Sequence, residues 1–207
     1  MTDRFRIAVL VSGSGTNLQA LIDTVHGADV EIACVAASRP DARGLERAAR
    51  AGIQTEVFAQ ETCGARDARD ATMADWLEQR GVQLVVLAGW MELLGSAFVR
   101  RFAGRIINVH PSLLPAFPGL RSIEQAVRYG VKATGVTVHF VDEGVDSGAI
   151  VLQEALELSY PAAIADIEER VHGVEHRLLP RAVRLIAEGR VRLDPVNPRV
   201  VLIDDVD

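Results

Sequence analysis

The chain has 207 residues, of which 49% are hydrophobic and 24% are charged, and its formal net charge is −6. This composition is typical of a globular protein that can bury a substantial core. The negative charge disfavours a general affinity for nucleic acid or anionic membranes, and no apolar run is long enough to span a bilayer.

The first half of the chain alternates segments typical of strands with segments typical of helices. We expect strands at 5–11, 30–37, 54–58 and 84–88, and helices at about 16–26, 41–51 and 65–80. The most apolar of these strands, at 84–88, fits the centre of a parallel sheet. Strands separated by helices require right-handed crossovers, so this order predicts an α/β fold with a doubly wound, Rossmann-like sheet.

A glycine-rich segment, Ser12-Gly13-Ser14-Gly15-Thr16-Asn17, lies where the first strand gives way to the first helix. Such a turn directs backbone N–H groups and the positive end of the helix at one point, which suits a phosphate. A plain turn with a Thr or Asn helix cap is the alternative. A dinucleotide site is disfavoured because Leu18 stands where the third glycine of GxGxxG would be. No Lys-Ser/Thr pair ends the loop, so a single phosphate monoester fits better than a nucleoside triphosphate.

The segment Asn108-Val109-His110-Pro111-Ser112-Leu113-Leu114-Pro115 completes a short apolar strand and continues into a turn stiffened by proline. Asn108 and His110 are two residues apart, so we expect them on one face of the strand. Acyl transfer needs a donor for a developing oxyanion and a group that moves protons near neutral pH. The alternative is a core strand in which Asn and His only satisfy backbone groups.

In the second half of the chain, apolar residues alternate with polar ones. We expect strands at 134–142 and 149–158, which could pair as an antiparallel extension of the sheet. Asp146 lies between them and could hold the His110 imidazole in its charged form. A long amphipathic helix at about 164–188 follows, and the tail after it is expected to form edge strands or to pack loosely.

Several of these motifs occur in the same order in a known family. The string Asn-x-His-Pro-Ser-Leu-Leu-Pro, followed by Phe117-Pro118-Gly119, resembles the signature loop of formyltransferases that use 10-formyltetrahydrofolate. With the 12–17 loop and Val138-His139-Phe140-Val141-Asp142, the chain resembles the phosphoribosylglycinamide formyltransferases of purine synthesis from about Ile7 to about Ile186. The resemblance implies transfer of a formyl group from 10-formyltetrahydrofolate, as co-substrate, to the amine of 5-phosphoribosylglycinamide. The products would be formylglycinamide ribonucleotide and tetrahydrofolate, and no metal is needed.

The resemblance also implies roles for individual residues. The catalytic residues would be Asn108, His110 and Asp146. The nucleotide substrate would be bound by Gly15, Thr16, Asn17, Pro111 and Glu175. The folate would be bound by Arg66, Met91, Glu92, Leu93, Leu94, Asn108, Asp142, Glu143, Gly144, Val145 and Asp146.

Some of these residues have plainer interpretations when the resemblance is set aside. Arg66 and Glu175 would each be an ordinary surface charge, and 91–94 would be core packing. The 142–148 loop would be a solvated turn or a weak calcium site. His139 is expected to be a core histidine with satisfied hydrogen bonds rather than a group that supports the site.

The chain departs from the family just after the signature loop. Histidines are frequent there in the family, whereas this chain has Gly119-Leu120-Arg121-Ser122-Ile123-Glu124. This difference leaves open which substrate contacts the turn makes, and it does not affect the expected chemistry.

We expect one continuous domain, because the chain has no repeats, low-complexity segments or flexible linkers. Its parts would be a nucleotide- and phosphate-binding half at about 1–103, a catalytic and folate-binding half at about 104–190, and a tail at 191–207. Cys34 and Cys63 lack CxxC spacing, so we expect buried or incidental thiols rather than a disulfide or a metal site.

The expected enzyme is cytoplasmic, because its first residues lack the apolar core of a signal peptide. Its partners would be small molecules, without nucleic acid or membrane, and it would be a monomer or a homodimer. Two rival reactions are formylation of methionyl-tRNA, which needs an extra C-terminal domain, and hydrolysis of formyltetrahydrofolate, which goes with an N-terminal regulatory domain. From another class, a non-catalytic phosphometabolite-binding module is disfavoured by the joint presence of Asn108, His110 and Asp146.

Overall fold

The computed structural model describes residues 4–28 and 30–204, which form two compact units that divide between Asn108 and Val109. The first unit contains β1 (Phe5–Val11), α1 (Thr16–Thr24), β2 (Val30–Ala37), α2 (Arg43–Arg50), β3 (Thr55–Val57), α3 (Gln60–Cys63), α4 (Arg66–Glu78), β4 (Leu84–Leu87) and α5 (Ser96–Arg101). A further strand, β5 (Ile106–His110), begins in the first unit and ends in the second.

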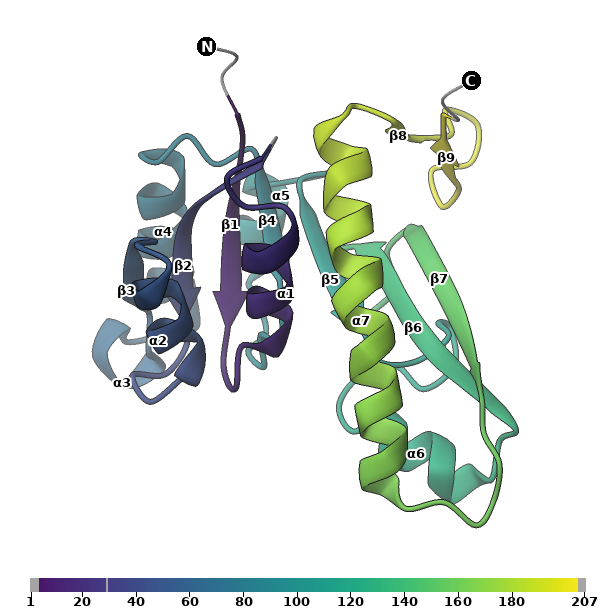
Figure 1. Ribbon diagram of the computed structural model, residues 1–207. Coiled ribbons are helices and arrows are strands. Elements are labelled where there is room, and N and C mark those ends of the chain that lie inside the picture. The colour runs from purple at the N-terminus through teal and green to yellow at the C-terminus, as the bar shows by residue number, and fades with distance from the viewer. Residues whose placement is uncertain (1–3, 29, 205–207) are drawn as a thin grey trace. The chain divides into compact units, whose positions relative to one another are not determined.

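The strands of the first unit are parallel and largely buried. β1 pairs with β2 and β4, β2 also pairs with β3, and β4 pairs with β5. β4 is buried along its whole length, as its uniformly apolar sequence predicts for a strand covered on both faces. α1 packs beside α2, and α4 packs beside α5. Helices therefore lie on both sides of the parallel strands (Figure 1).

The order of the strands reverses between β1 and β4. The chain runs outward from β1 to β2 and β3, and it returns to β4 on the other side of β1. Open α/β sheets place ligands beyond the carboxyl ends of the strands at such a reversal. The loops after β1 and β4, at 12–15 and 88–95, are thus the places in this unit where a ligand is expected.

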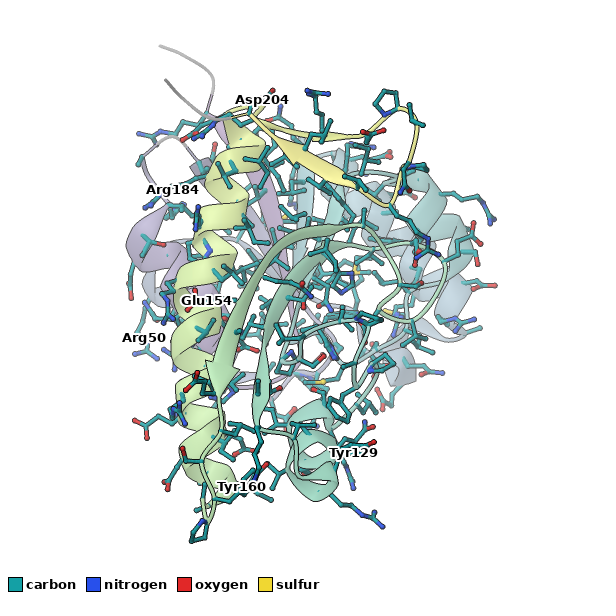
Figure 2. All side chains as sticks on the ribbon, turned by 90° about the vertical axis from the view of Figure 1, so that its right-hand side faces the viewer. Arg50, Tyr129, Glu154, Tyr160, Arg184 and Asp204 are labelled. Carbon is teal, nitrogen blue, oxygen red and sulfur yellow. The ribbon has the colours of Figure 1, made fainter. Side chains whose placement is uncertain are left out.

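The second unit contains α6 (Ser122–Tyr129), β6 (Ala133–Phe140), β7 (Ile150–Glu157), α7 (Ile164–Ala187), β8 (Val191–Leu193) and β9 (Val201–Ile203). β6 and β7 pair antiparallel, which confirms the predicted extension. α7 packs on both strands and continues through Pro180. Glu154 of β7 forms an ion pair with Arg177 of α7, and Figure 2 shows Glu154 beside this helix.

The seven strands of the main sheet follow the order β3-β2-β1-β4-β5-β6-β7. The five strands β3 to β5 are parallel to one another, and β6 and β7 add an antiparallel pair. The predicted fold class, a doubly wound and mostly parallel sheet with an antiparallel extension, is confirmed.

Three short helices were not predicted from the sequence. The helices α3, α5 and α6 have only four, six and eight residues, too few to establish an apolar period of 3.6 residues. In the tail, for which edge strands or loose packing were expected, β8 and β9 pair with each other in a separate two-stranded sheet. None of the described helices is long and apolar enough to cross a membrane.

Candidate active site

The loop after β1 takes its shape from Gly15. This residue has a φ of +68°, and a Cβ at this position would lie 2.6 Å from the Gly44 Cα. Gly15 is also the N-cap of α1, and none of the described side chains caps that helix end. The alternative of a Thr or Asn side-chain cap is therefore wrong for this helix. Backbone N–H groups and the helix dipole, without a capping side chain, suit an anion at Thr16 and Asn17.

An arginine that was not predicted as a site residue lies beside this loop. Arg47 of α2 donates from Nε to the Ser14 carbonyl at 2.9 Å and from Nη1 to Gln19 Oε1 at 3.1 Å. Its guanidinium adds positive charge next to the glycine-rich turn. The sequence gives no signal that separates Arg47 from the other arginines of α2, because the contact depends on how α1 and α2 pack.

Serine hydroxyls join the loops that follow β1, β2 and β4. Ser12 Oγ lies 2.7 Å from Ser38 Oγ and accepts a hydrogen bond from the Met91 amide at 2.8 Å. The Ser12 amide donates to the Gly89 carbonyl at 3.0 Å. The glycine-rich loop and the 91–94 loop are therefore held together by direct hydrogen bonds.

Four of the residues expected to bind folate, Arg66, Met91, Glu92 and Leu93, line a cavity of about 540 Å³. It is lined by Gln60, Ala65, Arg66, Asp67, Met91, Glu92 and Leu93. Met91 and Leu93 are 67% and 63% exposed, so the alternative interpretation of this segment as core packing is wrong for these two residues. Leu94 is half-buried and does not line the cavity. Exposed apolar side chains at a cavity of this size suit a flat ring system.

Asn108 and His110 both lie on β5, two residues apart, so their side chains leave the same face of the strand. Asn108 is half-buried, and His110 is 5% exposed. The prolines that follow end the strand, and the Ser122 hydroxyl donates to the Pro111 carbonyl at 3.3 Å. The start of the signature loop is thus tied to the first residue of α6.

Both ring nitrogens of His110 face oxygen acceptors. Nε2 lies 2.9 Å from the Phe117 carbonyl, and Nδ1 lies 3.3 Å from Asp146 Oδ2. A carbonyl and a carboxylate can only accept, so both contacts are satisfied together when each ring nitrogen carries a proton. The His110 ring is therefore held between a carbonyl and a carboxylate.

Asp146 is a carboxylate that accepts a backbone hydrogen bond and faces two histidines. Oδ2 accepts the Gly119 amide at 2.7 Å in addition to facing His110, and Oδ1 lies 3.6 Å from His139 Nε2. Partial burial acts to raise the pKa of Asp146, but the hydrogen bonds from His139 and Gly119 and the charges of both imidazoles outweigh it. The pKa of Asp146 therefore lies below its ordinary value, and the group is ionised at neutral pH.

His139 lies on β6 and combines both interpretations that the sequence allowed. It is 1% exposed, and its Nδ1 lies 2.8 Å from the Phe140 carbonyl, as expected for a core histidine. Its Nε2 also faces Asp146. His139 is therefore a buried core histidine, as expected, that also lies next to Asp146. Alternation along the strand gave its face, but not the position of Asp146.

The loop from Asp142 to Asp146 is closed by its own hydrogen bonds. Asp142 Oδ1 accepts the Gly144 amide at 3.0 Å and the Ser147 hydroxyl at 2.7 Å. Val145 is exposed despite being apolar. Within the described part of the chain, no group of three His, Cys, Asp or Glu residues is placed to hold a metal ion.

Arg66 and Glu175 could each have been an ordinary surface charge, and the structure contradicts this interpretation for Glu175 alone. Glu175 on α7 is 5% exposed, so it is not a surface charge. Arg66 is about half exposed and lies 3.9 Å from Asp67, which agrees with an ordinary helix-start charge as well as with a ligand contact. In the turn that departs from the family, Leu120 is exposed and Arg121 has a φ of +57°. Cys34 and Cys63 are free thiols, and burial raises the pKa of Cys34 to about 12.

Comparisons with known proteins agree with the family resemblance that the signature loop indicates. A family model described as Formyl transferase matches residues 5–183. This chain belongs to the formyl transferase family. The phosphoribosylglycinamide formyltransferase of Haemophilus influenzae is 43% identical over 190 residues, which cover 91% of this chain and 90% of that protein. The enzyme of the same name from Bacillus subtilis is 37% identical over 181 residues, or 86% of this chain and 93% of that protein.

A solved structure shares the fold. The crystal structure of glycinamide ribonucleotide transformylase 1 from Symbiobacterium toebii matches with a TM-score of 0.92 and 45% identity. The match covers 99% of this chain and 96% of that chain. The resemblance inferred from the separate sequence motifs is thereby confirmed at the level of family and fold.

Proposed function

We propose that the protein is a phosphoribosylglycinamide formyltransferase that moves the formyl group of 10-formyltetrahydrofolate to the amine of 5-phosphoribosylglycinamide. Relatives that bear this name match most of the chain at 37–43% identity. The observation that carries the proposal is the His110–Asp146 pair, in which an ionised carboxylate faces an imidazole with two acceptor-directed nitrogens. Such a pair can donate to an oxyanion and move a proton.

The reaction begins when the neutral amine attacks the formyl carbon. A new C–N bond forms, and the formyl oxygen becomes an oxyanion. The Asn108 amide and the His110 imidazolium donate hydrogen bonds to this oxygen, and one such donor contributes about 3–4 kcal/mol to stabilising the transition state. Asn108 and His110 can act on one atom because they leave the same face of β5.

His110 must exchange one partner during this step. Its Nε2 donates to the Phe117 carbonyl at 2.9 Å, while its Nδ1 remains directed at Asp146. The developing oxyanion replaces the neutral carbonyl as the acceptor, and a hydrogen bond to a charged oxygen is about twice as strong. The Phe117 carbonyl thus keeps the donor aligned until the oxyanion forms.

The tetrahedral intermediate collapses when the bond to N10 breaks. The attacking nitrogen loses a proton and the N10 nitrogen gains one, so the step is balanced without a metal or a redox group. Asp146 keeps His110 protonated and, through a water molecule, relays this proton. Its low pKa matches a group that must remain ionised.

Binding of the two substrates is assigned to the remaining residues. The phosphate would occupy the turn at Gly15, Thr16 and Asn17, a proposal supported by the uncapped end of α1 and the neighbouring Arg47. Pro111 and Glu175 would contact the rest of the nucleotide, and the burial of Glu175 supports a role other than solvation.

The folate would use the cavity and the Asp142–Asp146 loop. The cavity offers exposed Met91 and Leu93 for the ring system, and Arg66 offers a fixed positive charge for the acidic tail. Leu94 and Asn108 complete the proposed folate contacts in this part of the chain. We also propose a cytoplasmic enzyme that is a monomer or a homodimer.

An acceptor comparison tests the proposed function. Purified protein is mixed with 10-formyl-5,8-dideazafolate and either 5-phosphoribosylglycinamide or the same compound without its phosphate, and the deformylated folate is followed by absorbance. We expect rapid transfer to the phosphorylated amine and weak transfer to the other. Equal rates would contradict the phosphate site, and efficient formylation of methionyl-tRNA would contradict the proposed substrate.

A further inference from the structure

A buried arginine lies next to the 91–95 loop. Arg69, in the first turn of α4, has a side chain that is only 1% exposed, although arginine is rarely buried unless it is paired. Its guanidinium lies 5.6 Å from the centre of the Trp90 ring, and Trp90 directly precedes the loop. The position of Arg69 thus needs an explanation beyond helix formation.

Arg69 contacts two successive residues of the loop. Its Nη1 donates to Glu92 Oε2 at 3.4 Å, and its Nη2 donates to the Leu93 carbonyl at 3.1 Å. Nε and Nη2 also lie 2.9 and 2.8 Å from Asp70 Oδ1. The planar fork of a guanidinium can make these contacts together, whereas a lysine ammonium is a single compact charge.

Asp70 holds the end of the same loop. Its Oδ2 accepts the Gly95 amide at 2.6 Å, and its side chain is 3% exposed. Two adjacent residues of α4 therefore hold the loop at the Glu92 side chain, the Leu93 carbonyl and the Gly95 amide. Replacing a buried ion pair by apolar residues is often neutral or stabilising, so stability alone does not account for such a pair.

The loop held in this way lines the cavity. Met91, Glu92 and Leu93 belong to its wall, and the two apolar side chains remain exposed. The contact from Arg69 also offsets the charge of Glu92. Arg66, on the same helix, is then left as the cation that faces the cavity.

We propose that Arg69 and Asp70 form a positioning pair that sets the 91–95 loop for the ring system of the formyl donor. This inference rests on the proposed function, because it assigns the cavity to the folate co-substrate. Neither residue touches the reacting atoms, and both act through their contacts with the loop. The pair thus determines affinity for the donor and leaves the chemical step unchanged.

The test compares Arg69→Lys with Arg101→Lys. Arg101 of α5 is the matched control, because it makes ion pairs with Asp75 and Glu78 of α4 at an exposed site. For Arg69→Lys we expect KM for the 10-formyl donor to rise about ten-fold, with kcat and KM for the nucleotide nearly unchanged. Arg101→Lys should leave all three constants unchanged.

A second variant and a second measurement distinguish loss of the loop contacts from general unfolding. Asp70→Asn keeps the size of the side chain and removes its charge, and amide hydrogen exchange reports the mobility of residues 88–98 without any turnover. We expect faster exchange in this segment for Arg69→Lys and Asp70→Asn than for the wild type or Arg101→Lys. Unchanged exchange and unchanged donor KM in both variants would overturn the proposal.

Other outcomes separate this inference from the proposed function. An equal rise in KM for donor and nucleotide, with faster exchange throughout the chain, would show general destabilisation and would also overturn the positioning role. If the wild-type protein transferred no formyl group, the proposed function would fail. Tighter binding of 10-formyl-5,8-dideazafolate by the wild type than by Arg69→Lys would still support the role of the pair at the cavity.

Discussion

The chemistry of the proposed catalytic residues depends on their immediate neighbours. Asp146 is held by the Gly119 amide and by His110 and His139, so it stays ionised despite partial burial. His110 in turn faces two acceptors, the Phe117 carbonyl and the Asp146 carboxylate. In the proposed mechanism, this ionised carboxylate and the imidazole beside it act together on the oxyanion.

Substitution of the catalytic set should lower turnover without unfolding the protein. We expect Asn108→Ala, His110→Ala and Asp146→Ala each to lower kcat by about 10²–10³-fold, because each removes a group that acts in the transition state. Steady-state kinetics and thermal unfolding measured on the same preparations provide the check. Since the groups act together, the double variant of His110 and Asp146 should lose much less than the product of the single losses. Near-normal turnover in all three single variants would contradict the assignment.

The low pKa of Asp146 makes a prediction about stability. A group whose pKa is lowered on folding adds stability that is present above its unfolded pKa and is lost as the pH falls through its folded pKa. Asp146→Asn fits the same backbone, because Asn tolerates the φ of +51° at this position. The free energy of unfolding, measured by urea titration, should favour the wild type at pH 7, and this difference should shrink as the medium is acidified below the ordinary range for aspartate. A difference that is constant with pH would contradict the ionised, stabilised carboxylate.

At the scale of elements, apolar periodicity predicted most of the sheet and its long helices. The run at 84–88 became the fully buried β4, and the alternation after 133 became the antiparallel pair β6 and β7. Short helices such as α5 were not predicted, because they contain fewer than two turns. The pairing of β8 with β9 was not predicted, because strands of three residues carry too little pattern to show their partner.

Site residues were predictable where a motif fixed their spacing. The pairing of Asn108 and His110 on one strand face follows from alternation alone. The contact between His139 and Asp146 depends on the path of the loop between β6 and β7, which no pattern encodes. The burial of Arg69 was not predicted either, because an arginine within a polar helix is typical of a surface residue. Its burial depends on the loop that packs against it.

The turn between β1 and α1 gives a prediction at this scale. Gly15→Ala should weaken nucleotide binding and lower the melting temperature, because a Cβ would meet Gly44 at 2.6 Å and because φ is positive. Gly13→Ala is the matched control: no described atom lies within 4 Å of the Cβ it would add. Calorimetric titration with the nucleotide and with a folate analogue separates the two sites. Equal weakening of both ligands by Gly15→Ala would point to misfolding instead of a phosphate turn.

At the scale of the whole molecule, membership of the formyl transferase family and the shared fold narrow the chemistry to formyl transfer. The residues that make the reaction possible would also stabilise the oxyanion formed when water attacks. What distinguishes a transferase from a hydrolase is therefore the acceptor that reaches the formyl carbon. In our account, the phosphate turn and the contacts of Glu175 select the amine.

The most direct test of this account is the partition of the formyl group between amine and water. The wild-type protein is supplied with donor that carries a ¹³C-labelled formyl group, with and without 5-phosphoribosylglycinamide, and the products are quantified by NMR. The account predicts that nearly all label appears in the formylated nucleotide, and that release of labelled formate without the amine is much slower. Release of labelled formate at the same rate with and without the amine would contradict it.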